Sequence, residues 1–143
     1  MYKVDNIAAF VIEYENSVGR QINYLRLCRY LYFIQAQFLV MDKKPCFDEK
    51  ILAWDCGPMI ESVGRDYRMF GNCSIYKAQN PVGYIALQDR QTVISMLDTM
   101  SKYSNTALAQ IIFKQTPWMR ARTLWNKEIT QISLYDFFKE ETV

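Results

Sequence analysis

The side chains best suited to chemistry lie in the stretch AWDCGPMI at positions 53–60, where the carboxylate Asp55 precedes the thiol Cys56. A carboxylate can act as an acid or base, and a thiolate can act as a nucleophile. Neither could draw on a histidine, because the chain contains none. Histidine titrates nearest to neutral pH, so its absence removes Ser-His-Asp sites, Cys-His sites and HExxH zinc sites.

The other carboxylates do not suggest a catalytic pair. Glu13 and Glu15 are close in sequence but point apart on a helix. We therefore expect no enzymatic activity. One enzymatic hypothesis stays open, in which Asp55 works with Arg29 or Cys56 at the turn.

Metal and cofactor signals are also sparse. The four cysteines, Cys28, Cys46, Cys56 and Cys73, form no CxxC pair, which favours free thiols in a reducing cytoplasm over a zinc site. Neither a GxxxxGKS/T nor a GxGxxG motif occurs, and five glycines are few for a phosphate-binding loop. We expect no metal and no cofactor.

Length, composition and charge limit the class of protein. The 143 residues are 50% hydrophobic and 15% aromatic, which predicts one domain, residues 1–143, with a real core. A formal charge of +2 disfavours nucleic acid and anionic membranes as partners. The longest apolar stretch, residues 30–41, contains Gln35 and Gln37 and is shorter than the roughly 20 residues that span a bilayer. No segment resembles a signal peptide, so we expect a cytoplasmic protein without a membrane partner.

Apolar spacing predicts a mainly α fold: a single compact helical domain with a small β-hairpin or short strands. The expected helices cover residues 5–16 and 24–41, a stretch from Pro58 to Phe70, and segments that begin near 88, 105, 116 and 133. The helix at 24–41 is apolar on most sides, which is typical of a central helix. We expect the β-hairpin at 73–77 and 83–87.

Helix termini are predicted from capping residues. Asp5, Asn23, and either Ser104 or Asn105 are expected N-caps of three helices. Thr116-Pro117 reads as an N-cap followed by the first helical residue, and Ser133 to Asp136 as a capping box.

The turn at 53–60 has a structural interpretation that we favour over a catalytic one. Gly57 would supply the turn's backbone torsion, and Pro58 would occupy the first position of a helix. Trp54 would pack the extended run 51–54 against the central helix, so that Trp54→Ala costs about 3–5 kcal/mol if the ring is buried. Asp55 would pair with an arginine such as Arg29.

A narrow polar stripe marks the central helix, formed by Asn23, Arg26, Arg29 and Gln37. We favour a solvated edge with extended arginines for this stripe. The alternative, two arginines presented to an acidic partner, stays open.

Three segments resemble one known family. LRLCRYLYFIQAQFL at 25–39, AWDCGPMI at 53–60 and TPWMRAR at 116–122 are similar to the Panacea domain, the SocA-like antitoxin domain of bacteria and their phages. Arg29 stands where the family usually has lysine, and Met59 where it usually has valine. The residues that match and that we expect to maintain the scaffold are Leu27, Arg29, Leu31, Tyr32, Phe33, Ala53, Trp54, Gly57, Pro58, Pro117, Trp118, Ala121 and Arg122.

The resemblance implies an antitoxin that neutralises a cognate toxin by direct protein–protein binding. Some members of the family act as adaptors that deliver the toxin to a cytoplasmic protease, so a protease is a second implied partner. We expect partner binding on exposed residues, and name Arg65, Arg68, Met69, Tyr76 and Tyr84 as candidates.

Two alternatives remain. One is a phage- or prophage-encoded inhibitor of another host protein, which differs only in its target. The other, which the small net charge disfavours, is a nucleic-acid binder. Its candidate residues are Arg26, Arg29, Arg120, Arg122 and Lys127, with Trp118 or Trp125 for base stacking.

Overall fold

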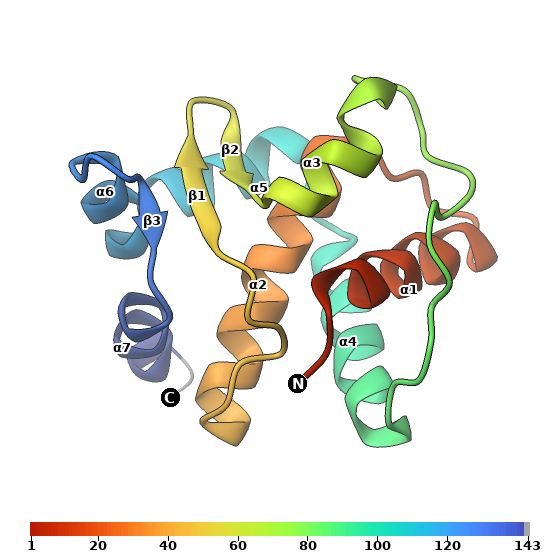
Figure 1. Ribbon diagram of the computed structural model, residues 1–143, viewed down its shortest axis with the longest axis horizontal. Helices are drawn as coiled ribbons and strands as arrows, with labels where there is room; N and C mark the ends of the chain where they lie inside the picture. Colours follow the sequence, from red (N-terminus) through yellow and green to blue (C-terminus); the bar gives the residue numbers. More distant parts are fainter. Residues whose placement is uncertain (142–143) are drawn as a thin grey trace.

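The other elements pack around one long helix, α2 (Tyr24–Asp42), which crosses the middle of the molecule (Figure 1). The computed structural model describes residues 1–141. Asn23 caps α2 as predicted, because its side-chain oxygen accepts a hydrogen bond from the Arg26 backbone N–H at 2.9 Å. Lys43, in the left-handed region at φ 55°, ends the helix. Thirteen of the 19 residues of α2 are buried, which confirms its central position.

The helices on one side of α2 are α1 (Val4–Ser17), α3 (Glu61–Tyr67) and α4 (Leu87–Met100) (Figure 1). The predicted N-cap of α1 is wrong. Asp5 lies inside the first turn, and the N-cap is Lys3, whose side chain makes no capping bond. A distant residue supplies the acceptor instead, since Glu49 Oε2 lies 3.2 Å from the Val4 backbone nitrogen. Tertiary contact therefore replaces the local cap.

The small sheet has the order β2-β1-β3 and is antiparallel, with β1 at Ile51–Trp54, β2 at Gly57–Met59 and β3 at Glu128–Ile129. The hairpin is thus the 51–59 turn itself, and α3 begins only at Glu61. The prediction that Pro58 starts a helix is wrong: Pro58 pairs with Ala53 on an edge strand, where a missing N–H costs no ladder bond. Gly57 has φ 140°, a conformation that favours glycine.

The hairpin predicted at 73–77 and 83–87 is also wrong. Residues 73–77 and 83–86 lie in an irregular connection from the short 3₁₀ helix η1 (Arg68–Phe70) to α4, and Leu87 is the first residue of α4. This connection bonds to other elements rather than to itself: the Ile75 N–H donates to the Ile22 carbonyl at 2.8 Å. The Gln79 N–H donates to the Tyr67 hydroxyl, also at 2.8 Å.

The remaining helices are α5 (Asn105–Phe113), α6 (Thr116–Arg122) and α7 (Gln131–Glu141). Ser104 caps α5 as predicted, accepting from the Ala107 N–H at 3.0 Å. Thr116 is already helical, because Gln115 is the N-cap of α6. The capping box at Ser133 is wrong, since the Thr130 hydroxyl accepts from the Ser133 N–H at 3.1 Å.

The mainly helical fold class with short strands is confirmed. No helix within residues 1–141 has both the length and the apolar character needed to cross a membrane.

A buried glutamine on α2 holds the connection from α2 to β1. The Gln35 side chain accepts from the backbone N–H groups of Cys46 and Phe47, at 2.8 and 3.3 Å, and donates to the Phe47 carbonyl at 2.7 Å. We expect Gln35→Leu to lower the free energy of unfolding by about 3 kcal/mol, because it leaves these buried backbone groups unpaired. Urea unfolding measures the change.

The matched control for this prediction is Gln37→Leu. Gln37 is bonded only to the sulfur of Met41 at the surface, so its replacement should change stability by less than about 0.5 kcal/mol. Equal losses in both variants would contradict the role assigned to Gln35.

Alkaline pH should destabilise the fold through two buried thiols. Burial raises the pKa of Cys28 and that of Cys46 to about 12. The unfolded chain releases these protons first, so stability is full below the ordinary thiol pKa and is lost as the pH rises toward 12. We expect a loss of about 1 kcal/mol per thiol between roughly pH 9 and pH 10, measured by urea unfolding. Cys28→Ala should reduce this loss by about half, because Cys46 remains, whereas replacement of the exposed Cys73 by serine should leave it unchanged.

Candidate functional site

Two arginines hold the β1–β2 hairpin from different elements. Arg29 on α2 donates to the Cys56 carbonyl at 3.0 Å and to the Asn105 carbonyl at 3.3 Å. Arg122 on α6 donates to the Ala53 carbonyl at 2.8 Å and to Asp55 Oδ1 at 2.7 Å. The three sequence segments on which the family resemblance rests therefore meet at this turn. Asp55 pairs with Arg122, and the expected pairing with Arg29 is wrong.

The interpretation of the arginine stripe as a solvated edge is wrong, because Arg26 and Arg29 are only 9% and 7% exposed. The connection from α4 to α5 covers them and supplies acceptors: Arg26 donates to the Tyr103 carbonyl and to Asn105 Oδ1 at 2.8 and 2.7 Å. Burial lowers the pKa of Arg29 from its ordinary value. No ion pair joins either arginine to a carboxylate among the described residues.

The prediction that Trp54 packs against the central helix as a buried anchor is wrong, since 44% of its surface is exposed. Side chains alternate along a strand, and in β1 Ile51 and Ala53 face the core, which turns Trp54 outward. The Arg68 guanidinium carbon lies 5.2 Å from the centroid of the Trp54 ring, a cation–π distance. Trp54 and Arg68 flank a cavity of about 340 Å³ that is also lined by Tyr24, Leu25, Cys56, Gly57, Pro58, Met59, Gly71 and Asn72.

Among the described residues, no hydrogen bond or ion pair joins the side chains of Asp55, Cys56 and Arg29 to one another. Asp55 and Cys56 are both exposed. Arg29 reaches the Cys56 carbonyl rather than its sulfur. Within residues 1–141 no three acidic or cysteine side chains gather at a spacing that could hold a metal ion.

The predicted partner-binding residues fall into separate groups. Arg65, Arg68 and Met69 are exposed on α3 and η1, and Arg68 adjoins Trp54. Tyr76 and Tyr84 are also exposed, on the connection to α4. That connection follows α1: the Ile75 carbonyl accepts from Asn16 near the end of α1, and Gly83 lies against Asn6 near its start. Ten helical residues span about 15 Å, so the two tyrosines do not form one patch.

The cations of the nucleic-acid hypothesis are not gathered on one exposed surface. Arg26 and Arg29 are buried, Arg122 binds the hairpin, and the Lys127 ammonium donates to the Arg122 carbonyl. Of the two stacking candidates, Trp118 is 7% exposed and Trp125 is 93% exposed.

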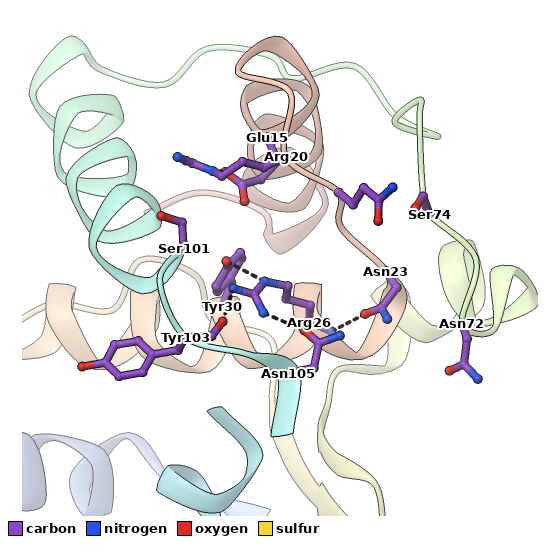
Figure 2. Close-up of a pocket in the computed structure, with 11 residues that line it drawn as sticks. Glu15, Arg20, Asn23, Arg26, Tyr30, Asn72, Ser74, Ser101, Tyr103 and Asn105 are labelled. Atoms are coloured by element: carbon purple, nitrogen blue, oxygen red, sulfur yellow. Dashed lines mark hydrogen bonds and ion pairs between the residues drawn. The ribbon is translucent and has the colours of Figure 1, made fainter. Parts of the chain in front are cut away.

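A polar pocket that the sequence analysis missed lies between α1, α2 and the start of α5 (Figure 2). Its volume is about 440 Å³. Glu15 and Arg20 stand on one side, and Arg26 and Asn105 on the other (Figure 2). The remaining lining residues are Gln21, Asn23, Tyr30, Asn72, Ser74, Ser101 and Tyr103.

One sequence signal could have revealed this pocket. Glu15 continues the buried face of α1 formed by Ala8, Val11 and Ile12, and is itself 1% exposed. A carboxylate on an apolar helix face needs a partner, and Arg20 follows five residues later. Arg20 donates from Nε and Nη2 to the same oxygen, Glu15 Oε2, at 3.0 and 2.7 Å.

We found no match to the chain among protein-family models, curated proteins or solved structures.

The arginine that joins α2 to the hairpin should contribute to stability. We expect Arg29→Met to lower the free energy of unfolding by about 2 kcal/mol, since two carbonyls lose a charged donor. Arg29→Lys should cost about half as much, because one ammonium cannot reach both carbonyls as a planar guanidinium does. Urea unfolding of the purified variants provides the measurement.

Arg120→Met is the control, since Arg120 is exposed on α6. A stability loss for Arg120→Met as large as that for Arg29→Met would show that removal of charge, and not loss of the hairpin contact, is responsible.

Proposed function

We propose that this chain is a cytoplasmic antitoxin-like protein that neutralises a cognate toxin by binding it directly. The proposal starts from the resemblance of segments 25–39, 53–60 and 116–122 to the Panacea domain. The contacts of Arg29 and Arg122 with the hairpin are consistent with a scaffold role for those segments.

The observation that carries the proposal is the exposure of Trp54 beside Arg68. We call Trp54, Arg68 and the adjacent Met69 the Trp54–Arg68 surface. Met69 is 76% exposed, and Trp54 borders a cavity lined mainly by apolar side chains. Tryptophan and arginine are the residues most enriched at the energetic centres of protein interfaces. A half-exposed tryptophan held by a cation–π contact is therefore suited to bind a protein partner.

Hydrogen bonds from Arg29 and Arg122 hold the hairpin that carries Trp54. Trp54 is the last residue of β1. Arg122 binds both of its neighbours in the chain, Ala53 and Asp55. A side chain held in its bound position loses less conformational entropy on association than a mobile one. The hairpin and the α3–η1 segment also project on the same side of the molecule (Figure 1).

The partner can be identified by capturing the tagged chain from its native cells and analysing what co-purifies by mass spectrometry. We expect one stoichiometric protein partner that is toxic when expressed alone and harmless when expressed with this chain. A partner that is a host protein without toxicity would instead favour the inhibitor hypothesis. Recovery of no protein partner would contradict both.

The lifetime of the captured toxin distinguishes two ways of neutralising it. A simple neutraliser leaves the toxin stable in the complex. An adaptor shortens the toxin's lifetime in cells that contain the cognate protease, and leaves it unchanged in cells that lack the protease.

Substitutions on the Trp54–Arg68 surface should separate binding from folding. We expect Trp54→Ala combined with Arg68→Ala to weaken partner affinity by about a hundredfold or more, the effect typical of two interface hot spots. Stability should fall by only about 1 kcal/mol, because both side chains are exposed. Calorimetric titration measures the affinity, and urea unfolding the stability.

Ile132→Ala on α7 is the matched control, since Ile132 is 74% exposed on another helix. Tyr76→Ala and Tyr84→Ala, tested singly, show whether the partner also covers the connection along α1. Wild-type affinity in the double Trp54, Arg68 variant would rule out this surface.

A further inference from the structure

The polar pocket of Figure 2 is lined by Glu15, one of whose carboxylate oxygens is buried and has no hydrogen-bond partner within residues 1–141. Arg20 donates two hydrogen bonds to Glu15 Oε2, while Glu15 Oε1 is buried and has no hydrogen-bond partner among the described residues. Nearly every buried polar atom in native proteins is hydrogen-bonded, so such an oxygen marks a place where a donor is expected. Because Glu15 lines the pocket, a ligand can supply that donor when the carboxylate turns its buried oxygen toward the pocket.

The opposite side of the pocket carries a buried positive charge. The Arg26 guanidinium donates to the Tyr30 hydroxyl, to Asn105 Oδ1 and to the Tyr103 carbonyl at distances of 2.7 to 2.8 Å, and to the Met100 carbonyl at 3.3 Å. These acceptors are uncharged. A buried charge without a counter-charge is costly, and an anion bound nearby offsets that cost.

The charges of the pocket are separated in space (Figure 2): Glu15 and Asp98 both pair with Arg20, and Arg26 makes no ion pair with either carboxylate. Glu15 and Arg20 form an ion pair at 2.7 Å, and Arg20 also contacts Asp98 at 2.8 Å outside the pocket lining. Arg26 therefore contributes positive charge on its own side. Asn23 caps the N-terminus of the 19-residue helix α2 at the same place, and the helix dipole adds further positive potential.

We propose that this pocket binds a small ligand with a hydroxyl group at one end and an anionic group at the other, as in sugar phosphates and nucleotides. The hydroxyl donates to Glu15 Oε1, and the anionic group lies toward Arg26 and the start of α2. Amide and hydroxyl side chains around the pocket, such as those of Gln21, Asn72 and Ser74, complete the hydrogen bonding. A volume of about 440 Å³ is within the range of small-molecule sites.

This ligand site is separate from the Trp54–Arg68 surface. It is lined by the α1–α2, η1–α4 and α4–α5 connections, whereas the proposed protein-binding surface lies at the hairpin. Among the lining residues of the two cavities, Asn72 is the one that both share. Ligand binding can therefore be tested on the purified chain alone, without a toxin.

The experiment compares four probes by calorimetric titration at low ionic strength. Ribose phosphate and AMP carry both groups, ribose carries only hydroxyls, and inorganic phosphate carries only the anion. We expect at least one of the two-ended probes to bind about tenfold or more tightly than ribose or phosphate. Binding of both two-ended probes identifies a sugar phosphate as the recognised unit, and binding of AMP alone identifies a nucleotide.

Two variants locate the binding. Glu15→Gln removes the carboxylate, and Ser74→Phe places a ring at the rim of the pocket without touching the Glu15–Arg20 pair. Both should weaken binding of the two-ended probe about tenfold or more, and Ile132→Ala should not. Ser74→Phe keeps the test valid if Glu15→Gln fails to fold.

Three results would overturn the proposal. They are the failure of both two-ended probes to bind at millimolar concentration, equal affinity for phosphate or ribose alone, and binding that survives in Ser74→Phe. None of these results bears on toxin neutralisation, which is measured with the captured partner.

Discussion

Two buried arginines on α2 hold together the parts of the molecule that the other features depend on. Arg26 and Arg29 are three residues apart and so lie on the same face of the helix. Both reach Asn105, Arg26 through its side-chain oxygen and Arg29 through its carbonyl. Within residues 1–141, the acceptors of their guanidinium groups are backbone carbonyls, the Asn105 amide oxygen and the Tyr30 hydroxyl, and none is a carboxylate. The α4–α5 connection and the hairpin therefore have defined positions relative to α2.

Arg29 and Arg26 position different parts of the molecule. Arg29 and Arg122 both donate hydrogen bonds to the β1–β2 hairpin, in which Trp54 points toward solvent next to Arg68. Arg26 places a positive charge across the polar pocket from the Glu15 carboxylate (Figure 2). The protein-binding surface and the ligand site that we propose are thus both built on one face of one helix. Asn105, which both arginines contact, connects them physically.

Local signals predicted the elements better than their ends. Asn23 and Ser104 were correctly predicted as caps, because each bonds to its own helix. The prediction of Asp5 as the N-cap of α1 was wrong, because Glu49, distant in sequence, supplies the acceptor for the Val4 N–H. The prediction that Pro58 starts a helix was wrong for a similar reason. Proline is tolerated at the start of a helix and also on an edge strand, and the pairing of Pro58 with Ala53 selects the strand.

The sequence by itself determined a mainly helical domain around an apolar central helix, because the spacing of apolar side chains sets which faces must be buried. Only the tertiary structure decided what covers each polar residue. It buried Arg26 and Arg29 beneath the α4–α5 connection and exposed Trp54. It also left Glu15, which lines the polar pocket, with one buried oxygen that has no hydrogen-bond partner among the described residues. Those outcomes depend on partners far away in the chain, and the local periodicity of a helix or strand carries no information about them.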